Sequence, residues 1–199
     1  MKIDIYSDNN GVLINKLGIS DGKLLKEAEA RIAAVKIITL RSRSFAEFNF
    51  NTLRTIHREI FEDIYDWAGE LRTVDIAKSM LFCRAMFLPD QADDIFSRLA
   101  KNNYLKNIKR LDFCEGAGNL FCDLNMLHPF RDGNGRSLRE FMFHLARSAG
   151  YVCDLNTVRR DIYLEASIKG HTDSSAMIRI MNAIVREDKV HEQQVQLGR

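Results

Sequence analysis

The sequence predicts a mainly helical domain that contains one short β-hairpin. Apolar residues recur every three or four positions through most of the chain, which is the period of an amphipathic helix. The 199 residues include only 2 prolines and no proline- or glycine-rich linker, so a single helical domain is favoured. Only residues 70–88 show the partial alternation of apolar and polar side chains that is typical of strands.

The composition is typical of a globular domain with a packed core. Hydrophobic residues make up 46% of the chain, enough for a packed core, and 29 basic residues nearly balance 27 acidic ones. The net charge of +2 argues against a general nucleic-acid or membrane-surface binder. No apolar run is long enough to span a bilayer, and the N-terminal residues lack the apolar core of a signal peptide. We expect one domain over residues 1–199, with its core at about 12–187 and peripheral segments at 1–11 and 188–199.

The N-terminal half is expected to contain two helices. Residues 1–20 are rich in turn formers and are expected to lie on the surface. The helical period of residues 21–35 predicts the first helix, with Ser20 as its N-cap. A polar loop is expected over residues 41–51, followed by a second helix over residues 53–69.

The C-terminal half follows the predicted hairpin at residues 70–88 and is expected to be helical. Pro89 suits the first turn of a helix, and Gly150 suits the position after a last turn. Helices are expected at about residues 89–99, 113–127, 134–149, 156–169 and 173–187.

The most informative segment is residues 128–139, with the sequence HPFRDGNGRSLR. It joins the end of one predicted helix to the start of the next. Gly133 and Gly135 allow backbone conformations that other residues resist, and a helix N-terminus has unpaired N–H groups and a dipole that favour an anion. The segment therefore predicts a phosphate cradle of the same physical type as a P-loop, although the GxxxxGK[ST] pattern is absent.

The side chains of this segment supply the other parts needed for phosphoryl or nucleotidyl transfer. His128 is a candidate general base, because imidazole titrates near neutral pH. Asp132 is a hard oxygen ligand that suits Mg²⁺ between two phosphates. Arg136 and Arg139 are three residues apart, so they share one side of the first helical turn and suit phosphate oxygens. Asn134 has two roles open to it, donation to a phosphate oxygen or fixing of the loop.

Each of these features has a structural explanation when it stands alone. A histidine at a helix end is more often a cap or core residue than a base, and an Asp-Gly-Asn-Gly run is usually a turn. Their occurrence together in one register favours a functional site. Metal-ligand spacing is absent for His144 and His171, and no CxxC pair occurs. Structural roles are expected for His57 and Trp67, and reduced, buried thiols for Cys83, Cys114, Cys122 and Cys153.

Residues 128–139 resemble the signature of the Fic (filamentation) family, HPFx[D/E]GN[G/K]R, which is long and specific. RTIHREIFEDIYDWAGELRTVDIAK resembles the helix and flap hairpin that precede this signature in bacterial Fic proteins, and INKLGISDGKLLKEAE resembles their N-terminal segment. The similarity covers about residues 12–185. It implies a helical core with a β-hairpin flap, and transfer of AMP from ATP to a hydroxyl side chain of a target protein.

The resemblance also implies roles for individual residues. His128 would deprotonate the incoming hydroxyl, and Asp132 would coordinate Mg²⁺ on the α- and β-phosphates. Arg136 would bind the β/γ end of ATP, Arg139 would bind the γ-phosphate, and the flap would hold the target segment by strand addition. The implied nucleotide-binding residues are Lys78 in the flap, Asn125, Gly133, Asn134, Gly135, Arg136, Ser137, Leu138 and Arg139.

Two details indicate the branch of the family. Gly135 stands where the kinase-like Doc branch has a lysine, so the resemblance favours AMP transfer. The inhibitory [S/T]xxxE[G/N] motif of many members is absent; Thr55 and Glu59 have its first spacing, but Ile60 follows in a core-type helix. The resemblance therefore implies a toxin or effector that is restrained by a separate small antitoxin, whose glutamate would pair with Arg139.

Other functions stay open. A Doc-like phosphotransferase, or another nucleotidyl transferase, would use the same base and cradle. An ATP- and antitoxin-binding protein without turnover is the third alternative, although a pure binder has no need of His128 as a base. A nucleic-acid binder is disfavoured by the near-neutral charge. We expect a protein of the bacterial cytoplasm, with secretion into a host cell as an effector as the second option.

Overall fold

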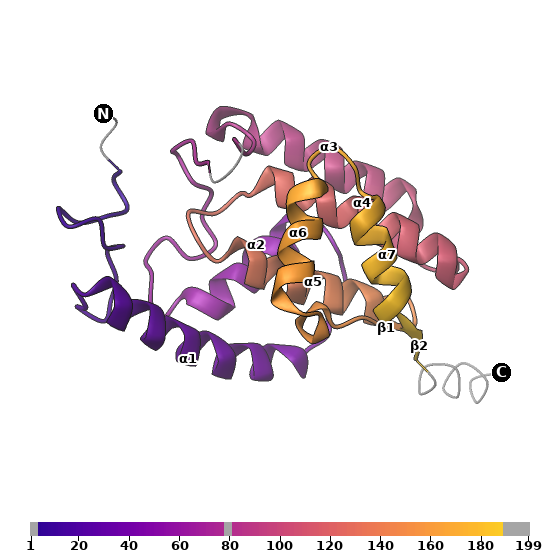
Figure 1. The fold of residues 1–199 in the computed structure, drawn as a ribbon, viewed down its shortest axis with the longest axis horizontal. Coiled ribbons are helices and arrows are strands. Elements are labelled where there is room, and N and C mark those ends of the chain that lie inside the picture. Colours follow the sequence, from indigo (N-terminus) through magenta and orange to yellow (C-terminus); the bar gives the residue numbers. More distant parts are fainter. Residues whose placement is uncertain (1–3, 78–80, 189–199) are drawn as a thin grey trace.

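The computed structural model describes residues 4–77 and 81–188, and it is mainly helical, as predicted (Figure 1). One two-stranded antiparallel sheet pairs β1 (Tyr151–Val152) with β2 (Arg186–Glu187). Short 3₁₀ turns are η1 (Ala85–Phe87), η2 (Asn103–Leu105) and η3 (Leu155–Thr157). The α-helices are α1 (Gly22–Arg41), α2 (Phe50–Phe61), α3 (Leu88–Lys101), α4 (Arg110–Leu127), α5 (Asn134–Ser148), α6 (Arg160–Lys169) and α7 (Ser175–Ile184).

Helix α4 is the centre of the core. Helices α3, α5 and α7 pack against it, and α2 packs against both α1 and α5, so that α1 lies along one edge of the domain (Figure 1). Phe113, Ala117 and Phe121 of α4 are fully buried. Gly118 allows α7 to approach closely, because a Cβ at this position would lie only 2.6 Å from the side chain of Ile178. The helix that carries His128 at its C-terminus is therefore held on several sides.

Helix boundaries near the N-terminus differ from the prediction. Asp21, and not the predicted Ser20, is the N-cap of α1, because its carboxylate accepts hydrogen bonds from two N–H groups of the first turn. Helix α2 begins at Phe50, inside the predicted loop, where the side chain of Asn49 supplies the cap. It ends at Phe61, and the rest of the predicted helix forms turns.

The flap segment, residues 70–88, contains one antiparallel bridge in its described part, between Ala77 and Leu81. Residues 78–80, which include the predicted site residue Lys78, lie outside the described part of the chain. The described residues after the bridge enter η1 and α3. Strand β1 lies between two of the expected helices. Strand β2 lies where the end of the helix over residues 173–187 was expected, so that end was wrong. Two-residue strands are too short to show an alternating pattern in the sequence.

The other helices lie close to their expected positions. Pro89 is in the first turn of α3, α4 runs into His128, and Gly150 follows α5 with a φ of 84°. Three of the cysteines are buried free thiols, as predicted, whereas Cys83 is partly exposed. Among the helices described, none combines the length and the apolar character needed to cross a membrane.

Candidate active site

The signature loop, residues 128–133, joins α4 to α5. His128 has a left-handed backbone, with φ 46° and ψ 60°, and this conformation turns the chain out of α4. At the other end Gly133 has φ 78°, and a Cβ there would lie 2.4 Å from the ring of Phe61. Glycine is therefore required at position 133 both by conformation and by space.

Two side chains fix the signature loop from inside. The amide of Asn134 exchanges two hydrogen bonds with the backbone of Phe130, at 2.8 and 2.9 Å, so it has the loop-fixing role. His57 stacks on Phe130, with 3.9 Å between ring centroids. Its Nδ1 accepts from the N–H of Gly69 at 2.8 Å, so Nε2 carries the proton and donates to the carbonyl oxygen of Asp132 at 2.9 Å. Burial lowers the pKa of His57 to about 3, and these contacts give it the structural role expected from the sequence.

His128 is held in one tautomer. Its Nδ1 lies 3.1 Å from the backbone carbonyl oxygen of Asn125. A carbonyl oxygen only accepts hydrogen bonds, so Nδ1 carries the proton of the neutral ring and Nε2 has the lone pair. Phe82 of the flap segment stacks on the imidazole, with 3.8 Å between centroids and 16° between planes. The tautomer with the lone pair on Nε2 is the one in which a neutral imidazole can act as a general base through that atom.

Arg72 ties the flap segment to the signature loop. Its side chain is buried, and the guanidinium donates to the backbone carbonyls of His128 and Val74 at 2.8 Å each, and to that of Cys83. The backbone N–H of Arg72 donates to the carbonyl oxygen of Pro129 at 2.9 Å. The base of the flap and the loop that carries His128 are therefore one hydrogen-bonded unit.

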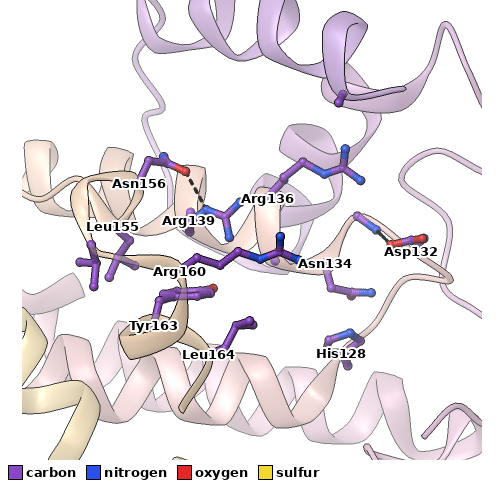
Figure 2. A pocket seen from close by; sticks show the side chains of 14 residues that line it. His128, Asp132, Asn134, Arg136, Arg139, Leu155, Asn156, Arg160, Tyr163 and Leu164 are labelled. Carbon is purple, nitrogen blue, oxygen red and sulfur yellow. Dashed lines mark hydrogen bonds between the residues drawn. The ribbon is translucent and has the colours of Figure 1, made fainter. Parts of the chain in front are cut away.

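A cavity of about 650 Å³ opens beside the signature loop. The loop and the N-terminal turn of α5 form one wall, and η3 and α6 form another (Figure 2). Seven of the predicted site residues line this cavity: His128, Asp132, Gly133, Asn134, Gly135, Arg136 and Arg139.

Three other predicted residues do not line the cavity. Asn125 lies one turn before His128, and its Nδ2 donates to the carbonyl oxygen of Ser167 at 3.1 Å, which joins α4 to α6. Ser137 and Leu138 are buried in the core side of α5. The helical period explains this difference, because positions 136 and 139 share one face of α5 and the two positions between them do not.

Arg136 is held at the cavity by Glu29 of α1. The two side chains form an ion pair, and the guanidinium carbon lies 4.6 Å from the ring centroid of Phe61. Glu29 is buried and also accepts a hydrogen bond from the hydroxyl of Tyr65. Burial and the Glu29 carboxylate raise the pKa of Tyr65, so its hydroxyl keeps the proton that it donates. Arg136 is therefore preorganised at the cavity, with part of its charge already balanced.

Arg139 and Arg160 contribute positive charge to the cavity that no carboxylate of the described residues balances. Arg139 has a neutral partner, since its Nε donates to Oδ1 of Asn156 at 2.8 Å, and its guanidinium carbon lies 5.3 Å from the ring centroid of Tyr163. Figure 2 shows the side chain of Arg160 extended over the cavity from the first turn of α6. Neither arginine forms an ion pair with any residue in the described ranges. The cavity thus suits a ligand with several negative charges.

The wall formed by η3 and α6 was missed by the sequence analysis. Arg160, Tyr163 and Leu164 share one helix face, and Asn156 approaches from η3. These residues follow the signature by about twenty positions and belong to no recognised motif. The one signal was an arginine, an aromatic and an exposed leucine at i, i+3 and i+4, and many ordinary helices share that pattern.

Asp132 is the candidate metal ligand. One of its carboxylate oxygens accepts from the N–H of Gly133 at 2.6 Å, and this contact holds the carboxylate at the cavity. Within residues 4–77 and 81–188 no cluster of three or more His, Cys, Asp or Glu residues could hold a metal alone. Mg²⁺ commonly binds one or two carboxylates and takes its other ligands from substrate phosphates and water. A single carboxylate beside a phosphate cradle fits that donor set.

Known proteins resemble this chain in sequence. The Fic/DOC family profile matches residues 47–146. A probable protein adenylyltransferase Fic of Escherichia coli K12 is 30% identical over 178 residues, which cover 88% of either chain. The chain belongs to the Fic/DOC family. Protein adenylyltransferase VbhT of Bartonella schoenbuchensis is 37% identical over 188 residues, and these cover 93% of this chain but 39% of VbhT.

The Fic fold also recurs in solved structures. The N-terminal Fic domain of a putative cell filamentation protein from Bartonella quintana, with bound ADP, superposes with a TM-score of 0.87 at 27% identity. That match covers 93% of this chain and 96% of the other. BepC of Bartonella tribocorum has a TM-score of 0.88 at 24% identity, with 92% and 97% of the chains covered, which shows the same Fic fold.

Proposed function

We propose that this Fic protein is a protein adenylyltransferase, which transfers AMP from ATP to a serine, threonine or tyrosine hydroxyl of a target protein. The observation that carries the proposal is the convergence of His128, Asp132, Arg136 and Arg139 on one cavity, with His128 in the tautomer of a base. Relatives are named protein adenylyltransferases, and the similar Bartonella quintana domain binds ADP. Both facts support a nucleotide in this cavity.

The N-terminus of α5 would hold the polyphosphate. The N–H groups of Asn134 and Gly135 belong to the first turn and have no acceptor within the helix. Arg136 would bind the β/γ end and Arg139 the γ-phosphate, because guanidinium groups bind phosphate oxygens in pairs. Arg160 would add positive charge from the opposite wall. Mg²⁺ held by Asp132 would neutralise part of the phosphate charge when it is bound.

The reaction would be an in-line displacement at the α-phosphorus. Nε2 of His128 would take the proton of the target hydroxyl while the oxygen–phosphorus bond forms. The bond from the α-phosphorus to the bridging oxygen would break, and pyrophosphate would leave with the charge that Arg136 and Arg139 stabilise. The Asn125 carbonyl would stabilise the imidazolium through its hydrogen bond with Nδ1.

The target segment would dock on the flap segment by strand addition. Leu81, Met86 and Phe87 are exposed apolar side chains there, and they would contact the target beside His128. The hydroxyl of the docked segment would then face Nε2 of the base. This event would take place in the bacterial cytoplasm, or in a host cell if the protein is secreted as an effector.

A separate antitoxin would restrain the enzyme. Glu59, the acidic residue of the nearest match to the inhibitory motif, forms its ion pair with Arg43 and not with Arg139. Among the described residues no carboxylate pairs with Arg139. A glutamate from a small antitoxin would therefore find this guanidinium available, and its ion pair would compete with the γ-phosphate.

The Doc-like alternative is a phosphotransferase that would add only a phosphate. The resemblance to the family favours AMP transfer, because Gly135 stands where the Doc branch has a lysine. A Cβ at this position would meet its nearest atom, Nη1 of Arg139, at 3.5 Å, which is an ordinary contact. Space alone therefore does not require glycine at position 135.

Mass spectrometry of a cell lysate tests both reactions. The lysate is incubated with the protein, Mg²⁺ and ATP that is labelled on the α-phosphate, with the His128→Ala variant as control. A labelled adduct of the mass of AMP, made only by the unchanged protein, is expected. An adduct of the mass of a phosphate would contradict AMP transfer and indicate the Doc-like reaction. The absence of any adduct would favour a binding protein without turnover.

A further inference from the structure

Asn156 contacts Arg139 directly and lies outside the signature. Its Oδ1 accepts a hydrogen bond of 2.8 Å from Nε of Arg139, and it lines the cavity from η3. The partner of this guanidinium is therefore an amide, which carries a dipole but no net charge. An amide can orient the guanidinium without neutralising the charge that a phosphate needs.

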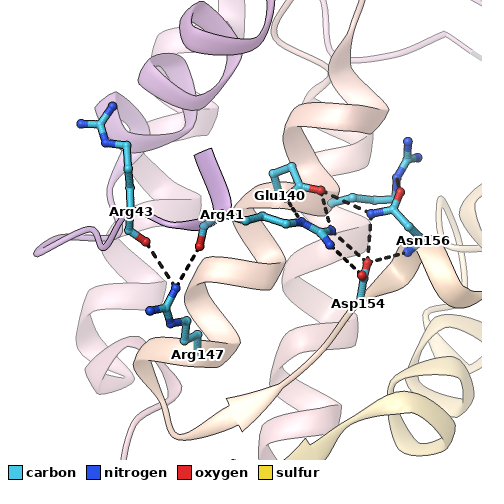
Figure 3. Close-up of polar contacts among 7 residues, drawn as sticks. Arg41, Arg43, Glu140, Arg147, Asp154 and Asn156 are labelled. Atoms are coloured by element: carbon cyan, nitrogen blue, oxygen red, sulfur yellow. Dashed lines mark hydrogen bonds and ion pairs between the residues drawn. The ribbon is translucent and has the colours of Figure 1, made fainter. Parts of the chain in front are cut away.

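Two carboxylates set the orientation of this amide (Figure 3). Nδ2 of Asn156 donates to Oδ1 of Asp154 at 2.9 Å and to Oε1 of Glu140 at 3.3 Å. Ionised carboxylates only accept hydrogen bonds, so the NH₂ group of the amide must face them. The amide oxygen must then face the other way, toward Arg139.

Arg41, the last residue of α1, holds both carboxylates in place. Its guanidinium donates to Glu140 at 2.7 and 2.8 Å and to Asp154 at 2.8 and 3.0 Å, in two bidentate pairs (Figure 3). The side chain of Glu140 is only 1% exposed. Arg147 fixes Arg41 in turn, with a hydrogen bond of 3.0 Å to its backbone carbonyl. A connected network, buried at Glu140 and half-buried at Arg41 and Asp154, thus runs from α1 to the exposed Asn156 at the cavity.

We propose that Asn156 is a positioning residue, which aims the guanidinium of Arg139 at the terminal phosphate of the bound nucleotide. Glu140 and Asp154 set the direction of its amide, and Arg41 holds the two carboxylates. This inference rests on the proposed function, since it assigns the nucleotide phosphates to Arg139. A carboxylate at position 156 would instead form an ion pair with Arg139 and compete with the phosphate.

Nucleotide binding tests the proposal without any need for a target protein. Calorimetry would compare a non-hydrolysable ATP analogue with AMP, both with Mg²⁺, in the unchanged protein and in Asn156→Leu and Asn156→Asp. Both variants are expected to bind the analogue about tenfold more weakly, the range of a hydrogen bond to a charged group. AMP has no γ-phosphate, so its affinity is expected to stay the same. Asn119→Asp is the matched control, because Asn119 is exposed on α4 and bonds to Ser174 away from this cavity.

A double-mutant cycle separates positioning from a general structural effect. In an Arg139→Ala background, Asn156→Leu is expected to cause no further loss of affinity for the ATP analogue. Equal losses for the analogue and AMP, additive losses in the cycle, or no loss in either Asn156 variant would each overturn the inference. If the unchanged protein does not bind the analogue, the proposed function itself fails. The unchanged protein could instead bind the analogue normally, with affinity lost in Arg139→Ala but not in Asn156→Leu. That result would overturn only the role of Asn156.

Discussion

Nε of Arg72 donates a hydrogen bond of 2.8 Å to the backbone carbonyl oxygen of His128, a residue 56 positions later in the chain. His128 has a φ of 46°, and residues other than glycine keep such a backbone only where the surroundings hold it. The same guanidinium binds carbonyls on both sides of the Ala77–Leu81 bridge of the flap segment, those of Val74 and Cys83. Arg72 therefore sets the position of the candidate base relative to the surface proposed to dock the target.

Replacement of Arg72 by methionine is expected to lower both stability and transfer rate. The variant loses its hydrogen bonds to several buried carbonyls, so the free energy of unfolding should fall by about 2–4 kcal/mol. ATP affinity should change little, because Arg72 does not line the cavity. Urea denaturation measures the free energy of unfolding, and calorimetry measures the affinity for ATP. The transfer rate is measured at saturating ATP. Arg72→Lys keeps the charge and should recover part of the rate.

Arg110 offers the matched control for Arg72. Its guanidinium also donates to backbone carbonyls, those of Asn182 at 3.1 Å and Val185 at 3.5 Å, but at the far end of α4 from His128. Arg110→Met should therefore reduce stability and leave the transfer rate per folded molecule unchanged. If Arg110→Met slows transfer as much as Arg72→Met does, the effect of Arg72 is one of general stability.

Removal of the imidazole in His128→Ala is expected to slow AMP transfer by about 10²–10⁴-fold, the usual contribution of a general base. Binding of ATP should persist, because the phosphate contacts proposed here come from α5 and its arginines. A filter assay for transferred label and calorimetry with ATP measure the two effects. An unchanged transfer rate would remove His128 from the role of base, and a parallel loss of ATP binding would point to collapse of the signature loop.

Stability is expected to fall in mild acid because two histidines are buried in the neutral form. Burial lowers the pKa of His57 to about 3 and that of His144 to about 4, whereas an unfolded chain has a histidine pKa of about 6.5. Below about pH 6.5 the unfolded chain binds protons that the folded protein does not, so the stability present above this pH is lost as the pH falls. The free energy of unfolding should drop by up to about 1.4 kcal/mol per pH unit for each histidine. Urea denaturation at about pH 7 and about pH 5 measures this slope.

His144→Phe isolates one of the two contributions. Nε2 of His144 is buried without a hydrogen-bond partner among the described residues, and its ring packs edge-on against Phe45 and Phe143. Phenylalanine keeps the aromatic contacts and cannot bind a proton. The variant should therefore show a shallower loss of stability in acid than the unchanged protein. An identical slope would show that His144 does not titrate as its burial implies.

The helices could be predicted from the sequence because each long one has enough apolar residues to show its period. Helices α3, α4 and α5 lie within a few residues of their expected positions. Cap residues and very short strands depend on a single side chain or on tertiary pairing, and these were the errors. Asp21 is the cap in place of Ser20 because its carboxylate accepts hydrogen bonds from the first turn, and the sequence alone does not show these contacts. Strand β1 pairs with β2, which lies more than thirty residues later in the chain.

The candidate site could be predicted only where a continuous motif carries it. The signature contributes one wall of the cavity, and seven of its residues do line that wall. The positions of Glu29, Asn156 and Arg160 depend on how α1, η3 and α6 pack against α5, and periodicity says nothing of that packing. Asn125, Ser137 and Leu138 were assigned from the family pattern. The side chain of Asn125 donates to the Ser167 carbonyl of α6, and the side chains of Ser137 and Leu138 are buried, so their assignment to the nucleotide stays a prediction.

Gly133 and Gly135 should respond in opposite ways to the same substitution, although both were assigned to one anion cradle. Gly133→Ala places a Cβ 2.4 Å from the ring of Phe61 at a φ of 78°, so strain and overlap should destabilise the protein by at least about 1–3 kcal/mol. Gly135 lies in the first turn of α5 with no atom closer than 3.5 Å to the added Cβ, and alanine favours a helix over glycine by up to about 1 kcal/mol. Gly135→Ala should therefore be neutral or stabilising in urea denaturation. Equal destabilisation by both substitutions would mean that the left-handed turn at Gly133 is not what shapes the signature loop.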